Sequence, residues 1–210
     1  MPRELIRLSV RAQRALWGLR LTRAYGLGIG ISYAITLFAV SATPLIATKL
    51  WARALATASW VVGVGALSLA RDLASRDAEQ GLTGLARLRG FDELGLERAR
   101  ALAGALRLSG AVAVPGLLVA LAALLEFRTL GAAAQAASLA LLTLPYAALL
   151  GTTLALLARL SQRLLPGRGR TVFLVMALGP WLLAMGTGAS IPNVPSAFAW
   201  LLDRLVGTVT

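Results

Sequence analysis

The chain has 210 residues, of which 58% are hydrophobic and only 14% are charged, so it lacks the polar side chains that cover a water-soluble globule. The net charge is +12, and the charged residues lie between long apolar runs, which favours a membrane-topology signal over nucleic-acid binding. The sequence contains no cysteine and no histidine, which excludes disulfides, metal sites built on these ligands and the commonest general base. We therefore expect an all-α polytopic membrane protein with no cofactor and no metal of its own.

Residues 3–21 are predicted to form an amphipathic helix at the start of the chain. Leucines recur on one face at spacings of three and four, beside Trp17, and arginines recur on another face by the same rule. This pattern is typical of a helix that lies in the headgroup layer of a bilayer. The alternative is an ordinary cytoplasmic helix that packs on its own protein.

Apolar stretches close to the ~20 residues that a spanning helix needs follow along the chain. The final stretch, residues 196–210, is short and contains Asp203 and Arg204, so we expect an interfacial, re-entrant or short sixth crossing there. In total we expect five to six transmembrane helices in a single transmembrane domain, residues 1–210. The five predicted spans cover residues 24–40, 54–70, 108–125, 130–158 and 172–189.

The basic residues are distributed unevenly between the two sides that these spans define. With a cytoplasmic N-terminus, residues 1–23, 71–107 and 159–170 lie inside and hold 17 of the 21 basic residues. The positive-inside rule predicts this asymmetry. Alanine, leucine, glycine and arginine dominate the composition, as in products of GC-rich bacterial genomes, so we expect the bacterial inner membrane with the N-terminus in the cytoplasm.

The motifs of common enzymes are absent from the sequence. The only lysine, Lys49, does not belong to a glycine-rich phosphate loop, and no Gly-x-Ser-x-Gly elbow occurs. The only adjacent pair of acids is Asp92 and Glu93. We interpret it as a solvated helix start after Gly90 rather than as a metal site. We therefore expect no catalysis in this chain.

The connector at residues 71–107 is the longest polar stretch and holds six of the nine acids. Within it, Leu82, Leu85 and Leu88 are spaced by three and form one apolar stripe, while Arg87 and Arg89 lie off it. A short helix of this kind can dock into a groove on a soluble partner. A loop that packs on its own helix ends fits the same pattern.

These features resemble the membrane subunit of type-2 ABC exporters and the related membrane subunit of the haem exporter used in cytochrome c maturation. In that family an acidic residue and a glycine precede a short leucine-rich helix after the second span, and a basic residue stands at the foot of the third span. Gly84 occupies a position where the family usually has glutamate, and a full sixth span is not evident. The resemblance is carried by Arg76-Asp77-Ala78-Glu79-Gln80-Gly81, by Leu85 and Leu88, by Arg98 or Arg100, and by Pro145 and Pro180 in the last two spans.

The resemblance implies that two membrane subunits, identical or similar, pair with two cytoplasmic ATP-binding subunits that hold ATP and Mg²⁺. ATP-driven closure of the ATPase would push on a coupling helix in the connector and open a path between the membrane subunits. A non-transport assembly or scaffold subunit of a larger membrane complex is the alternative function. The residues that the resemblance assigns to partner binding are Arg76, Asp77, Glu79, Gln80, Gly81, Leu85, Arg87 and Leu88.

Overall fold

The computed structural model describes residues 9, 17–40, 43–70, 81, 84, 87, 88, 90–127, 130–180, 197, 200 and 204. Within these residues the protein consists of helices and turns, without a strand. A short helix, α8 (Gly169–Phe173), and a π-helical turn, η1 (Leu174–Leu178), follow the last long helix. The four long helices are α2 (Trp17–Ala39), α3 (Pro44–Ala66), α6 (Glu93–Phe127) and α7 (Leu130–Leu164).

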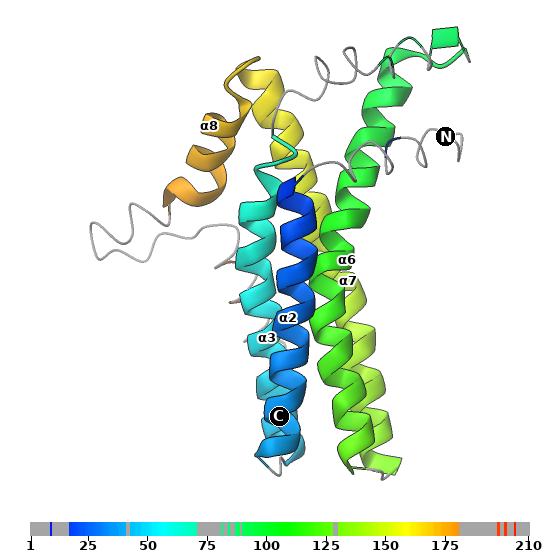
Figure 1. Cartoon of the computed structure of the whole chain (residues 1–210), viewed down its shortest axis with the longest axis vertical. Coiled ribbons are helices and arrows are strands. Elements are labelled where there is room, and N and C mark those ends of the chain that lie inside the picture. Colours follow the sequence, from blue (N-terminus) through cyan, green and yellow to red (C-terminus); the bar gives the residue numbers. More distant parts are fainter. Residues whose placement is uncertain are drawn as a thin grey trace.

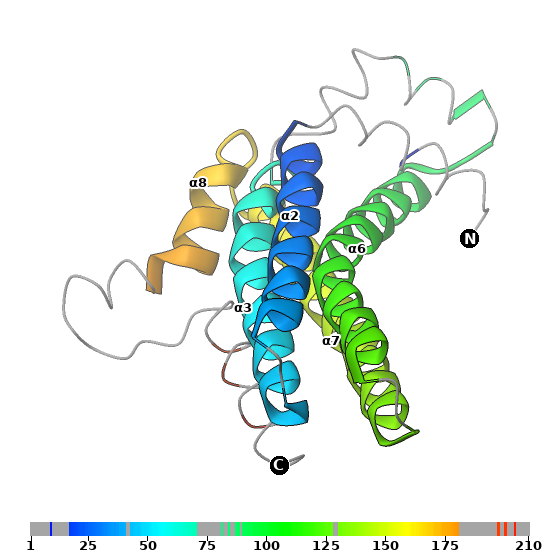
Figure 2. The same cartoon turned by 60° about the horizontal axis from the view of Figure 1, so that its bottom comes forward.

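Successive long helices alternate in direction and form a bundle (Figure 1). The start of α2, the connector from α3 to α6 and the turn from α7 to α8 therefore all lie at one end, which we call the arginine-rich end. Helix α6 packs against α2, α3 and α7, while α8 packs against α7. In both views of the chain α8 lies on the side of α3 that faces away from α6 (Figure 2).

The starts of α3 and α6 follow from local capping residues. The Thr43 side chain accepts a hydrogen bond from the Ile46 N–H at 3.4 Å, and Pro44 occupies the first turn, where its missing N–H costs nothing. At α6, Asp92 Oδ1 accepts from the Gly95 N–H at 2.9 Å. The predicted helix start at Asp92 is thereby confirmed.

Helix boundaries differ from those of the predicted spans. Helix α2 runs unbroken through residues 21–24, where we expected an interfacial helix to give way to a span. Helix α3 starts at Pro44 rather than near residue 54, because the cap at Thr43 outweighs two exposed basic residues in its first half. Helix α6 starts inside the predicted polar connector, and α7 starts at residue 130 as predicted but extends to Leu164. Of the predicted interfacial helix before Trp17, only Ser9 is described.

The last predicted span, residues 172–189, is described as far as Pro180. Here the Gly179 N–H donates to the Leu174 carbonyl, five residues back, which defines a π turn. The π turn comes directly before Pro180, whose ring removes the next helical donor. In the terminal stretch the Arg204 guanidinium lies 5.3 Å from the centroid of the Trp200 ring, within range of a cation–π contact.

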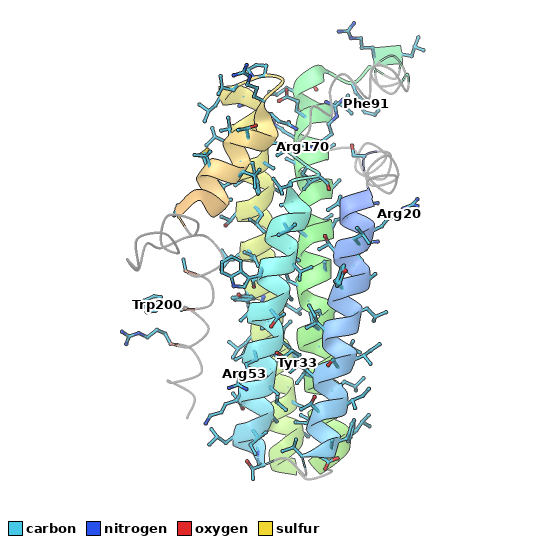
Figure 3. The ribbon with its side chains drawn as sticks, turned by 60° about the vertical axis from the view of Figure 1, so that its left-hand side comes forward. Arg20, Tyr33, Arg53, Phe91, Arg170 and Trp200 are labelled. Atoms are coloured by element: carbon cyan, nitrogen blue, oxygen red, sulfur yellow. The ribbon has the colours of Figure 1, made fainter. Side chains whose placement is uncertain are left out.

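Apolar side chains cover much of the outside of the bundle. Two helical stretches, Leu94–Glu126 and Ala133–Leu164, are long and apolar enough to span a membrane by length and composition. Side chains project outward along the bundle, with Arg170 and Phe91 at the arginine-rich end and Arg53 in the opposite half (Figure 3). Large apolar side chains that are more than half exposed include Tyr25, Ile35, Val64, Leu106, Leu121, Leu141, Leu149 and Leu156.

Candidate functional site at the arginine-rich end

The described residues of the connector before α6 include one leucine of the predicted stripe, Leu88. Leu88 is 86% exposed, so this side chain does not pack on the helix ends, while Leu82 and Leu85 lie outside the described residues. Arg87 and Leu88 have helical backbone, and the Gly90 N–H donates to the Arg87 carbonyl at 2.9 Å to close a turn. Gly81 has a φ of 69°, a conformation that favours glycine. Of the predicted partner-binding residues, Arg76, Asp77, Glu79, Gln80 and Leu85 lie outside the described residues.

A cavity of about 330 Å³ opens beside the connector, between the end of α3 and the facing turns of α6 and α7. Among the described residues that line it are three arginines and one carboxylate. The turn between α7 and α8 closes one side, with Gly167 at a φ of 83°. The lining residues are Leu69, Glu97, Arg100, Ala101, Gly104, Ala155, Ala158, Arg159, Gln162, Arg163, Pro166, Gly167 and Gly169.

An ion-pair cluster joins α6 to α7 at the rim of this cavity. Both Arg159 Nη2, at 2.5 Å, and Arg163 Nη2, at 3.0 Å, donate to the same oxygen, Oε2 of Glu97. The hydrogen bond from Arg159 holds the pKa of the Glu97 carboxyl below its usual range. Glu97 comes before Leu108, where the predicted third span starts, and its side chain is 44% exposed. The cluster therefore ties the two helices together while remaining open to solvent.

The end of α3 is attached to α7 by a further contact. Gln162 Nε2 donates to the Leu69 carbonyl at 2.8 Å. Carbonyls just beyond a helix end lack partners in their own helix, so this amide satisfies a group that otherwise needs water. The site is thus framed by α3, α6 and α7 at once, and movement of any of these helices changes its shape.

Below the site, a series of hydrogen bonds continues along the facing sides of α3 and α7. Trp51 Nε1 donates to Thr143 Oγ1 at 2.9 Å, and both side chains are buried. Ser59 Oγ lies 2.7 Å from the Tyr146 hydroxyl and also donates to the Leu55 carbonyl, so the tyrosine is the donor to Ser59. At the far end, Gln135 Nε2 donates to the Pro44 carbonyl at 2.7 Å and to Thr48 Oγ1 at 2.8 Å.

The two candidate basic residues at the foot of the third span occupy different environments. Arg100 lines the cavity, whereas Arg98 is exposed on the surface of α6. Sequence reasoning did not identify the role of Glu97, which pairs with residues more than 60 positions later. The available signal was the spacing of four between Arg159 and Arg163, which puts both on one helix face.

This arrangement can hold an anion, since three guanidinium groups converge on a cavity that contains a single described carboxylate. Its inner wall is formed by alanine, glycine and leucine, which suits an apolar group attached to that anion. No family model, no curated protein and no solved structure matches this chain.

Proposed function

We propose that the chain is the membrane-spanning subunit of an ATP-driven, ABC-type exporter in a bacterial inner membrane. Its partners would be a separate cytoplasmic ATP-binding subunit, which holds ATP and Mg²⁺, and a second membrane subunit. The residues of the connector that follow α3 would receive the motion of the ATPase. The chain itself would supply the path through the membrane and no catalytic group.

The observation that carries the membrane part of this proposal is the exposed apolar surface of the bundle. Ile35, Leu121 and Leu141 are 62%, 52% and 69% exposed, and they lie on three different helices. A water-soluble monomer rarely exposes a contiguous apolar area of more than a few hundred Å². Lipid is the environment in which such a surface is stable, and the two long apolar stretches of α6 and α7 support the same conclusion.

The direction of insertion follows from the charges. Helices that alternate in direction bring the start of α2, the connector and the α7–α8 turn to one end. The segments predicted for that end hold six, seven and four basic residues. Short connections rich in arginine stay in the cytoplasm, which supports a cytoplasmic arginine-rich end.

Coupling to an ATPase is supported by the way the connector is attached. It leaves α3 through the turn at residues 67–70 and enters α6 at the Asp92 cap. Since α6 packs against α2, α3 and α7, a displacement of the connector moves a helix that the rest of the bundle contacts. ATP binding to a partner can then shift the bundle between two states. The size of the shift is set by how much the affinity for ATP differs between those two states.

The test is purification of the chain with its native partners, followed by two substitutions in the connector. Arg87→Glu reverses a charge beside the exposed Leu88, and Gly81→Pro forbids the positive φ of Gly81. Each is expected to lower transport-coupled ATP hydrolysis about tenfold, equivalent to ~1.4 kcal/mol in activation free energy, while membrane insertion persists.

The matched control is Arg168→Glu, a charge reversal in the other turn of the same end, which should leave coupling within about twofold of the native protein. Unchanged ATP hydrolysis and transport in both connector variants would contradict the coupling role. Stable co-purification with membrane proteins alone, and no ATPase, would instead favour an assembly or scaffold subunit.

A further inference from the structure

The cavity at the arginine-rich end has two chemically different walls. The small or apolar lining residues come from α6, from α7 and from the turn after α3, namely Leu69, Ala101, Gly104, Ala155 and Ala158. The basic lining residues are Arg100, Arg159 and Arg163. A ligand that fits both kinds of residue has a compact anionic group joined to an apolar part.

Three of the described lining residues are positively charged and one, Glu97, is negatively charged. Arg159 and Arg163 each direct one nitrogen, Nη2, at the same carboxylate oxygen of Glu97. A guanidinium carries five N–H donors in a fixed planar fork, so one shared oxygen uses a small part of what these two side chains offer. An oxyanion with several oxygens, such as phosphate, matches two neighbouring forks in both charge and geometry.

The depth of the cavity agrees with a lipid-like ligand. Gly104 lies four residues, or ~6 Å along a helix, before Leu108, where the predicted third span starts. The headgroup layer on each side of a bilayer is about 5–8 Å thick, so with the span placed there Gly104 lies at the depth of the lipid headgroups. A cavity of about 330 Å³ holds a headgroup, with the acyl chains left outside among the exposed leucines.

We propose that this cavity binds the phosphate group of an anionic phosphate ester, with the headgroup of an anionic phospholipid as the favoured source. Arg159 and Arg163 hold the phosphate oxygens, Arg100 adds positive charge, and the alanine and glycine wall receives the glycerol side of the headgroup. Glu97 keeps the two arginines of α7 side by side when the site is empty. The inference rests on the membrane placement proposed above and is independent of any ATPase.

The experiment uses the full chain purified in a neutral detergent, with thermal unfolding and native mass spectrometry as readouts. Phosphatidylglycerol, phosphatidylcholine, glycerol phosphate and inorganic phosphate are added separately. Phosphatidylglycerol at tenfold above its Kd should raise the unfolding midpoint by about 3–6 °C and remain bound in the mass spectrum, while phosphatidylcholine should do neither. If glycerol phosphate or inorganic phosphate produces the full shift and lipid adds nothing, the phosphate site stands and its source is a soluble ester.

Two variants locate the site. Arg163→Gln, at a side chain that is 59% exposed, and Arg100→Gln should each weaken phosphatidylglycerol binding about tenfold. The matched control, Arg168→Gln, removes an exposed arginine that does not line the cavity and should keep native binding. Measuring each variant without ligand establishes that it is folded.

Equal shifts with phosphatidylglycerol and phosphatidylcholine, or equal weakening by Arg163→Gln and Arg168→Gln, would overturn the proposal. Failure of the coupling proposal is distinguishable from failure of the lipid proposal. Arg87→Glu tests coupling through ATP hydrolysis, and it should leave the lipid-induced shift intact in either case.

Discussion

Two helix contacts in this bundle are built in opposite ways. Where α2 meets α6, glycines bring the backbones together, since a Cβ built at Gly26 would lie 2.7 Å from the Ala111 carbonyl oxygen. Gly30, one turn further along α2, faces Pro115 in the same manner. Where α3 meets α7, the buried Trp51 fills the space and its indole N–H reaches Thr143.

The difference shows what each contact depends on. The atom nearest to a Cβ at Gly26 is a backbone carbonyl oxygen, so a larger side chain there has no flexible neighbour to displace. At Gly30 the Pro115 Cα, at 2.8 Å, sets the same limit beside the Leu118 side chain. At the α3–α7 contact the helices are joined by particular polar atoms, each of which can be removed with little change in shape. In a bilayer, where lipid is as apolar as leucine, close packing and hydrogen bonds are the main sources of helix association. We therefore expect α2 and α6 to move as one unit and α3 and α7 to be the adjustable pair.

The largest effect should come from enlarging a glycine at the α2–α6 contact. Gly26→Leu places a side chain against the Ala111 carbonyl oxygen, 2.7 Å from the new Cβ, so the helices must separate. Overpacking of this kind costs about 3 kcal/mol, and it should lower the midpoint of thermal unfolding in detergent by roughly 6–12 °C.

The control lies two residues away on the same helix. A Cβ at Gly28 would meet nothing within 4 Å, and leucine has a higher helix propensity than glycine, so Gly28→Leu should not lower stability. Equal losses of stability in Gly26→Leu and Gly28→Leu would show that the contact with α6 is not what limits Gly26.

A smaller effect is expected at the α3–α7 contact. Thr143→Val keeps the shape of the side chain but removes the acceptor of the Trp51 indole N–H, which is 1% exposed. An unsatisfied buried donor costs about 1–2 kcal/mol, measured by reversible unfolding in detergent.

A double-mutant cycle isolates this term. In a Trp51→Phe background the indole N–H is absent, so adding Thr143→Val should cost less than about 0.5 kcal/mol. The same cost of Thr143→Val in both backgrounds would show that the hydrogen bond contributes nothing and that Thr143 acts through packing alone.

Much of the fold could be predicted from hydrophobicity and turn residues, but helix ends could not be placed from hydropathy alone. The predicted second span starts near residue 54, just after Lys49 and Arg53. The helix instead begins at Pro44, since both basic side chains are exposed and can extend toward water while their backbone stays helical. The Gly26-x-x-x-Gly30 pattern is the sequence signal for the α2–α6 contact, which is absent from the expectations above.

The candidate site could be predicted less well than the fold. Its arginines stand out in the sequence, and their spacing puts Arg159 and Arg163 on one face of a helix. Their common partner, Glu97, lies on a different helix, and only the order in which helices pack brings it to the same end. To choose between Arg98 and Arg100, one must likewise know which face of α6 points toward the cavity, and composition does not reveal this.

The smallest effect is expected from Glu97 and concerns pH. Because the bond from Arg159 lowers the pKa of Glu97 from its ordinary value of 4.5, folding is stabilised above pH 4.5 and loses this contribution as the pH falls further. The side chain is 44% exposed, so the contribution should stay below about 1 kcal/mol. Glu97→Gln should therefore lower the unfolding midpoint at pH 6 by no more than roughly 4 °C, with the difference from the native protein shrinking as the pH falls below 4.5.

Salt separates this ion-pair effect from a change in packing. Screening by concentrated salt weakens an exposed pair, so the difference at pH 6 should shrink at high ionic strength. A difference between Glu97→Gln and the native protein that neither shrinks as the pH falls below 4.5 nor weakens in high salt would show that Glu97 supports the α6–α7 contact through its shape. In that case Arg159 and Arg163 would have to be held side by side by something other than the charge of this carboxylate.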